Sequence, residues 1–191
     1  MRIRATCTAV LALLLLAPFA PAQIPTKPAQ PATLRSILLA QLHSTHDKAE
    51  WFVPVNTAVA GLTPEQARWI PKSESPNPAP ADHSVGMLAY HLLFWNTEAL
   101  AKFKGEKVPP EPADNNETFN KFDATNWPDT VRELDAVLTA WEQAVAAAPD
   151  AKIAAEASTI AHIGTHNAYH TGQILEIRKL QGSWDPNKGV K

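Results

Sequence analysis

The sequence predicts an all-α fold, a bundle of four amphipathic helices. Apolar residues recur every three or four positions in four segments, close to residues 33–61, 84–104, 128–148 and 157–181, which is the spacing of a helix that buries one face. No segment shows the alternation of apolar and polar residues that is typical of strands. Prolines and glycines fall between the four segments, where helices are expected to end. Helices with one apolar face bury that face by packing on one another.

Residues 1–22 precede the predicted bundle and have the pattern of a secretory signal peptide. Two arginines come first, followed by a short apolar run and a small-x-small cleavage site, Ala20-Pro21-Ala22. The apolar run is too short for the roughly 20 residues that a membrane span needs, so an uncleaved anchor is the weaker alternative. We therefore expect an exported protein, periplasmic or secreted, with no membrane span after cleavage.

Composition narrows the class of partners. The formal net charge is −2 at pH 7 and the basic residues are not clustered, so the sequence predicts no nucleic-acid partner. The only cysteine, Cys7, lies in the predicted signal peptide, so the exported chain would have neither a disulfide nor a thiol nucleophile. We expect an extended, proline-containing lead-in at 23–32, the bundle at 33–186 and a C-terminal tail at 187–191.

The first helical segment carries signals for its start and for an interruption. Thr33 is the predicted N-cap of a helix over 33–61, and Pro54 is expected to kink or interrupt that helix. The sequence Thr63-Pro64-Glu65-Gln66 then predicts a short helical turn, because proline is favoured in the first turn of a helix.

The second helical segment has clear ends and is followed by a long irregular stretch. Ser84 is the predicted N-cap of a helix over 84–104, and Gly105 ends it. Residues 106–127 show no sustained periodicity. Loops of this length are uncommon unless they serve a function or are mobile.

The last two helical segments are each bounded by a proline, a serine or a glycine. Pro128 fits the start of the third helix, and Pro149 stops it. The fourth helix is predicted over 157–181, with a cap near Ser158 and an end at Gly182.

Three histidines on the predicted inner faces of two helices form the main candidate site. His166 and His170 are four residues apart, so their side chains project from one helical face about 6 Å apart. His91 lies on the inner face of the second helix, between Leu88 and Trp95. Histidines from facing helices can bind a divalent metal with coordination positions left for water. The alternative is plain core packing, but buried imidazoles without an ion leave polar nitrogens to satisfy.

Three further residues are candidates for supporting roles. His162 precedes His166 by one turn and is predicted to lie beside the site or at its outer edge. Glu98 lies two turns after His91, either as a base or orienting group or as a solvated glutamate. His46 can face inward from the first helix. A metal-bound water would be acidified, which permits hydrolysis or nucleophilic transfer.

Several motifs resemble those of the DinB-like (DinB/YfiT) superfamily. These are His166-Asn167-Ala168-Tyr169-His170-Thr171-Gly172-Gln173-Ile174, the following stretch 178–186, and the apolar run 85–92 that contains His91. The resemblance implies an up-down-down-up bundle with a long crossover loop. It also implies a divalent metal, zinc or nickel, bound by His91, His166 and His170. Members are often dimers, so a homodimer is expected.

The resemblance leaves the activity open. Some members are thiol-dependent S-transferases, and others isomerise maleylpyruvate. Export would separate this chain from cytoplasmic low-molecular-weight thiols, which weakens the S-transferase interpretation. The leading hypothesis is a metal-dependent hydrolase or transferase whose small-molecule substrate the sequence does not identify. The alternatives are a non-catalytic metal-binding or interaction module, in which the metal is structural, and a bundle without metal.

Overall fold

The computed structural model describes residues 31–72 and 83–189. The chain divides into two compact units, Met1–Pro31 and Ala32–Lys191. Nearly all of the first unit lies outside the described residues.

Some sequence-based expectations fall outside the described residues. They include the signal peptide at 1–22, almost all of the lead-in at 23–32 and the last two residues of the tail at 187–191. These expectations stay predictions.

All regular secondary structure among the described residues is helical, which confirms the all-α class. No helix in the described part of the chain is both long and apolar enough to cross a membrane. The elements are α1 (Leu34–His46), α2 (Val55–Val59), α3 (Pro64–Ala67), α4 (Val85–Lys104), α5 (Glu117–Asn120), η1 (Ala124–Asn126), α6 (Trp127–Ala147), α7 (Asp150–Gln181) and η2 (Pro186–Lys188).

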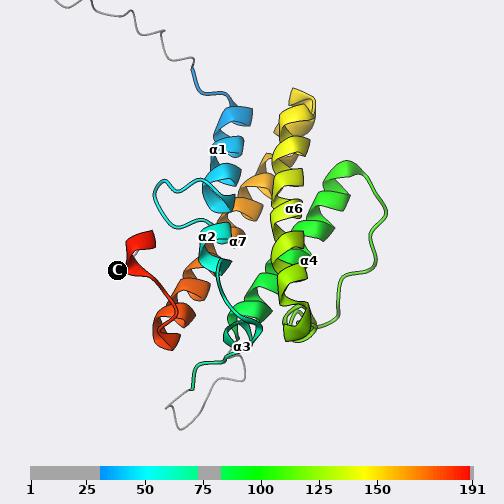
Figure 1. Ribbon diagram of the computed structural model, residues 1–191. Helices are drawn as coiled ribbons and strands as arrows, with labels where there is room; N and C mark the ends of the chain where they lie inside the picture. The colour runs from blue at the N-terminus through cyan, green and yellow to red at the C-terminus, as the bar shows by residue number, and fades with distance from the viewer. Residues whose placement is uncertain (1–30, 73–82, 190–191) are drawn as a thin grey trace, which may run out of the picture. The chain divides into compact units, whose positions relative to one another are not determined.

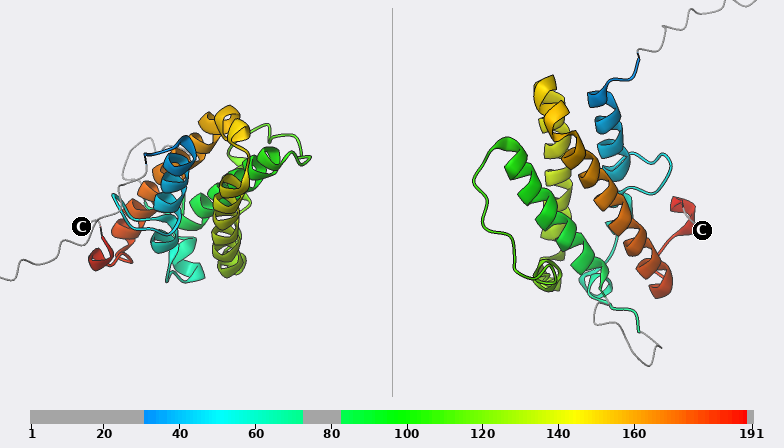
Figure 2. Two further views of the ribbon diagram at one scale, coloured as in Figure 1. Left: turned by 90° about the horizontal axis from the view of Figure 1, so that it is seen from above. Right: turned by 180° about the vertical axis from the view of Figure 1, so that it is seen from behind.

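The four longest helices pack side by side. Helices α1 and α4 each pack against both α6 and α7. Figure 1 shows that α1 and α7 run in one direction and that α4 and α6 run in the other. Helices α4 and α6 are therefore parallel, and the connection between them must return along the outside of the helices, as Figure 2 shows from behind. This order of directions agrees with the expected up-down-down-up arrangement and its long crossover.

The core between the four helices consists of large apolar side chains. Trp141 of α6 is completely buried, and its indole N–H donates to the Asn96 carbonyl of α4 at 3.1 Å. Leu88, Leu92, Leu134, Ile160 and Ile174 belong to the same buried cluster. Burying one such side chain contributes about 1.5–3 kcal/mol, so this cluster stabilises the packing of α4, α6 and α7.

Helix α4 has the ends that the sequence predicts. The Ser84 hydroxyl accepts the Met87 N–H at 3.2 Å, as an N-cap does. Gly105 has the left-handed φ of 80° that is common after a helix. The short turn that begins at Thr63 is also confirmed, with a capping box between Thr63 and Gln66.

Two predicted helix boundaries are wrong. The first helix does not continue to residue 61 but ends at His46, and α2 begins after Pro54. Residues 47–54 are not helical, so the predicted interruption is present but begins well before Pro54, which itself restricts only the residue before it. The last helix begins at Asp150 instead of residue 157. Its first turns are rich in alanine, which favours helix without producing an apolar stripe.

His46 connects the end of α1 to α6. It is buried, and its ring nitrogens lie 2.8 Å from Glu142 Oε1 and 2.9 Å from Asp135 Oδ1. Burial disfavours the imidazolium, but the hydrogen bonds to Asp135 and Glu142 and the charges of Glu142 and Asp47 outweigh it and raise the pKa of His46. His46 therefore acts as a buried cation between two carboxylates.

Replacement of His46 by glutamine is expected to destabilise the fold by about 1–3 kcal/mol, because the two carboxylates lose a charged donor. A raised pKa means that this stabilisation is complete below pH 6.5, the ordinary value, and is lost as the pH rises through the folded-state value. Urea unfolding of wild type and His46→Gln should therefore differ more at about pH 6 than at about pH 9. His162→Gln, at an exposed position of α7, serves as the control. An equal difference at both pH values would contradict a cationic His46.

Candidate metal centre

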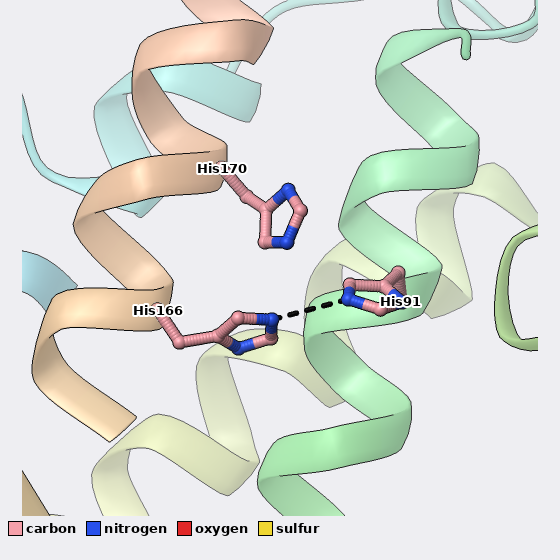
Figure 3. A group of neighbouring side chains, drawn as sticks. All are labelled: His91, His166 and His170. Carbon is pink, nitrogen blue, oxygen red and sulfur yellow. Dashed lines mark hydrogen bonds between the residues drawn. The ribbon is translucent and has the colours of Figure 1, made fainter. Parts of the chain in front are cut away.

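The three predicted histidines meet between α4 and α7. His91 lies in the first half of α4, and His166 and His170 lie one turn apart on α7. Figure 3 shows the three rings projecting from the two helices toward one another. His91 and His170 are buried and His166 is half-buried, so the group is largely shielded from solvent.

The distances between these rings suit a shared ion. The Nε2 atoms of His91 and His166 are 3.1 Å apart. One ligand atom from each histidine lies within 4.8 Å of the other two. A tetrahedral zinc site with Zn–N bonds of about 2.0–2.1 Å separates two ligand nitrogens by about 3.3 Å. The three histidines can therefore hold one divalent metal ion with small side-chain adjustments.

Two of the histidine rings form a hydrogen bond through one nitrogen. This bond fixes which of the two ring nitrogens is left to bind a metal. His170 Nδ1 lies 2.6 Å from Gln173 Oε1, an oxygen that only accepts. His91 Nδ1 lies 2.6 Å from the hydroxyl of Thr118, which donates its own proton to the Asn115 carbonyl. Both Nδ1 atoms must therefore carry hydrogen, which leaves the Nε2 lone pairs for a metal.

The three histidines are neutral at pH 7. Burial, followed by the charges of the neighbouring histidines, lowers the pKa of His91 to about 3. Burial and His170 lower the pKa of His166 to about 4. Burial also lowers the pKa of His170, against the opposing effect of the hydrogen bond that His170 donates to Gln173. Neutral imidazole is the form that binds metal, so this donor set is ready to accept a cation without first losing protons.

Two residues of the site come from α5 and were not predicted from the sequence. Thr118 is the buried hydroxyl that orients His91. Phe119 is buried and stacks on the His91 ring, with ring centroids 3.9 Å apart and planes inclined by 8°. Both lie in the stretch 106–127, whose apolar residues have no helical period. Its unusual length was the only signal that it carries a function.

The position of α5 depends on a close contact with α4. The ring of Phe122, just after α5, occupies the space that a side chain at Gly86 would need. Glycine at this point of α4 thus lets the crossover segment lie directly on the helix. This contact holds Thr118 and Phe119 beside His91, one turn farther along α4.

A cavity of about 610 Å³ opens beside the histidines. Its size lies within the usual range of small-molecule sites, about 300–1,000 Å³. The residues that line it are His91, Trp95, Ala99, Asn115, Phe119, Thr159, His162, Ile163, His166, Tyr169 and His170. All three candidate ligands therefore face one space that can admit a small molecule.

The structure places the three residues that the sequence suggested for supporting roles in different surroundings. His162 lines the cavity, in agreement with a place at the edge of the site. Glu98 does not line it. Its carboxylate lies 3.8 Å from Lys102 Nζ, beside a different cavity near Val108. His46 is hydrogen-bonded to carboxylates of α6, so the structure brings neither Glu98 nor His46 to the cavity beside the three histidines. Glu98 and His46 both lie at the sequence spacing that predicts a buried side chain, but a helix in this fold is buried on more than one side.

Comparison with known protein families identifies the superfamily of the chain. A model of the DinB superfamily matches residues 55–174. The chain belongs to the DinB superfamily. The match covers His91, His166 and His170 and begins after α1, so the expected resemblance is confirmed. No curated protein and no solved structure matches the chain.

Replacement of Thr118 by valine in this DinB-superfamily chain tests the orienting role of its hydroxyl. The change keeps the shape of the side chain but removes the acceptor for His91 Nδ1–H. Loss of such an outer hydrogen bond typically lowers metal affinity about 10–100-fold. Competitive titration with a chromogenic chelator would measure the change.

Thr130→Val is a matched control for Thr118→Val. Thr130 is also buried, its hydroxyl donates to the carbonyl of Asn126, the N-cap of α6, and it does not line the cavity beside the three histidines. Equal metal affinities for Thr118→Val and Thr130→Val would show that Thr118 does not orient a ligand.

Proposed function

We propose that this chain binds one divalent metal ion through His91, His166 and His170 and acts on a small molecule as a metal-dependent hydrolase or transferase. The observation that carries the proposal is that the three side chains line one cavity. A bound ion would face the space in which a small molecule fits.

The number of donors favours a catalytic ion. Structural zinc sites are closed by four protein ligands, whereas catalytic sites have three and keep a position open. Among the described residues, the group that can share this ion contains three members and no aspartate, glutamate or cysteine. Such an ion supplies an acidified water or a polarised substrate oxygen when bound. His162, an exposed residue, lies on the same cavity wall.

A structural role for the ion is the second candidate. His91 belongs to α4, whereas His166 and His170 belong to α7. An ion shared by them would tie two helices together. In that case metal binding would raise stability without any turnover.

The proposal also covers the identity of the metal, the export of the protein and its oligomeric state. Neutral imidazoles suit zinc and nickel, so we propose one of these ions. We also propose that residues 1–22 direct export, because they have the n-region, apolar run and cleavage pattern of a signal peptide. A homodimer is proposed from family membership alone. Cell fractionation with and without residues 1–22, and sedimentation of the processed chain, test these two points.

Elemental analysis of protein purified without a histidine tag should find one zinc or nickel ion per chain under metal-replete conditions. The ion should be lost in a His166→Ala/His170→Ala variant, because only one imidazole of the group remains. A second group of residues, His43, Asp47 and Glu142, also brings ligand atoms within 4.8 Å of one another. An ion that persists in the double variant but disappears in Glu142→Gln would place the metal there and contradict the proposal.

A measurement of activity distinguishes a catalytic ion from a structural one. We expect the metal-loaded protein to hydrolyse or transfer a group from members of an ester, amide and thioether panel, and the double variant to do neither. A large metal-dependent rise in melting temperature with no turnover on any compound would favour the structural role.

A further inference from the structure

We infer that the cavity beside His91, His166 and His170 selects an uncharged, mainly apolar small molecule that carries a single metal-binding head group. The inference rests on the proposed function, since the head group is the part that would meet the ion. It concerns the remainder of the ligand, which must lie against the cavity wall.

The wall beyond the three histidines contains no aspartate, glutamate, lysine or arginine among the described residues. Five of its members are aromatic or aliphatic: Trp95, Ala99, Phe119, Ile163 and Tyr169. The other members carry amide, hydroxyl and imidazole groups: Asn115, Thr159 and His162. Such a wall offers apolar surface with a few hydrogen-bonding groups.

Aromatic rings stand next to the histidines on both sides of the cavity. Trp95 lies one turn from His91 on α4, with ring centroids 6.5 Å apart and planes nearly perpendicular. Tyr169 adjoins His170 on α7, with centroids 4.9 Å apart. A ligand whose head group reaches the histidines therefore passes between aromatic surfaces from both helices.

Hydrogen bonds hold the polar edges of both aromatic side chains. The Trp95 indole N–H donates to Asn115 Oδ1 at 3.2 Å. The Tyr169 hydroxyl accepts from Gln173 Nε2 at 3.3 Å. Tyr169 is nevertheless largely exposed, so its ring marks the side on which the cavity opens to solvent. Burial of a flat apolar ligand there would remove aromatic surface from water.

Charged ligands find no lysine, arginine, aspartate or glutamate among the described residues of this wall. A carboxylate or phosphate on the ligand tail would lose water without gaining an arginine or lysine, which is costly. An acidic group next to the wall adds repulsion, because the Thr159 hydroxyl, which lines the cavity, donates to Glu156 Oε2 at 3.2 Å. A cationic tail would be repelled by the positive charge of the divalent ion. Substrates with several acidic groups are therefore excluded.

Two probes that differ at a single ring position test this selectivity. 4-Methylbenzohydroxamic acid and 4-carboxybenzohydroxamic acid share one metal-binding head group and differ in the charge of the tail. Calorimetric titration of the full zinc-loaded protein should give at least about tenfold tighter binding of the methyl compound. Equal affinities, or tighter binding of the carboxy compound, would overturn the inference.

Variants of the cavity wall make the test specific. Trp95→Ala should weaken the methyl compound about tenfold at unchanged metal content, whereas Trp51→Ala, on a 95% exposed side chain outside the cavity, should not. Thr159→Lys should shift the preference about tenfold toward the carboxy compound, because it supplies the missing cation. Unchanged preference in Thr159→Lys would also contradict the inference.

Metal-free protein separates this inference from the proposed function. Nile red, a neutral apolar dye, should bind the metal-stripped chain and lose affinity in Trp95→Ala but not in Trp51→Ala. If the chain holds no metal but binds the dye in this way, the proposed function fails and the apolar character of the cavity stands. If metal binds and the two hydroxamates do not differ, only the inference fails.

Discussion

The register between α4 and α7 is the constraint on which the site depends. Asn96 and Asn167 face each other across these helices with both side chains fully buried, and Asn96 Nδ2 donates to Asn167 Oδ1 at 2.8 Å. Buried amides need such partners, whereas the surrounding leucines and isoleucines would tolerate small shifts. A slip of one turn, about 5.4 Å, would break this pair. It would also carry His91 away from His166, since the two pairs share the same helices.

The path of the chain explains how a third segment reaches the site. Because α4 and α6 are parallel, the chain must return the length of α4 before α6 can begin. This return segment includes α5, and Gly86 lets it lie close against α4. Thr118 and Phe119 are thereby placed on His91. The long crossover is therefore both a requirement of the topology and the source of the contacts that orient a ligand.

Sequence reasoning identified the three histidines because their positions follow local rules. The spacing of His166 and His170 puts them on one face of α7, and His91 sits in an apolar stripe. It missed Thr118 and Phe119, because long-range packing alone brings them to the site. It also named His46 and Glu98 as candidates for supporting roles, whereas the structure places both away from the cavity. Inward spacing shows that a side chain is buried, but only the tertiary structure shows against which neighbour, here Glu142 for His46.

The central claim is that imidazoles from α4 and α7 share one ion. X-ray absorption at the metal edge of untagged, metal-loaded protein tests it most directly. We predict a shell that contains three imidazole nitrogens at about 2.0–2.1 Å, reduced to two in His91→Ala. A spectrum that does not change on replacement of His91, or a shell without imidazole, would contradict the account.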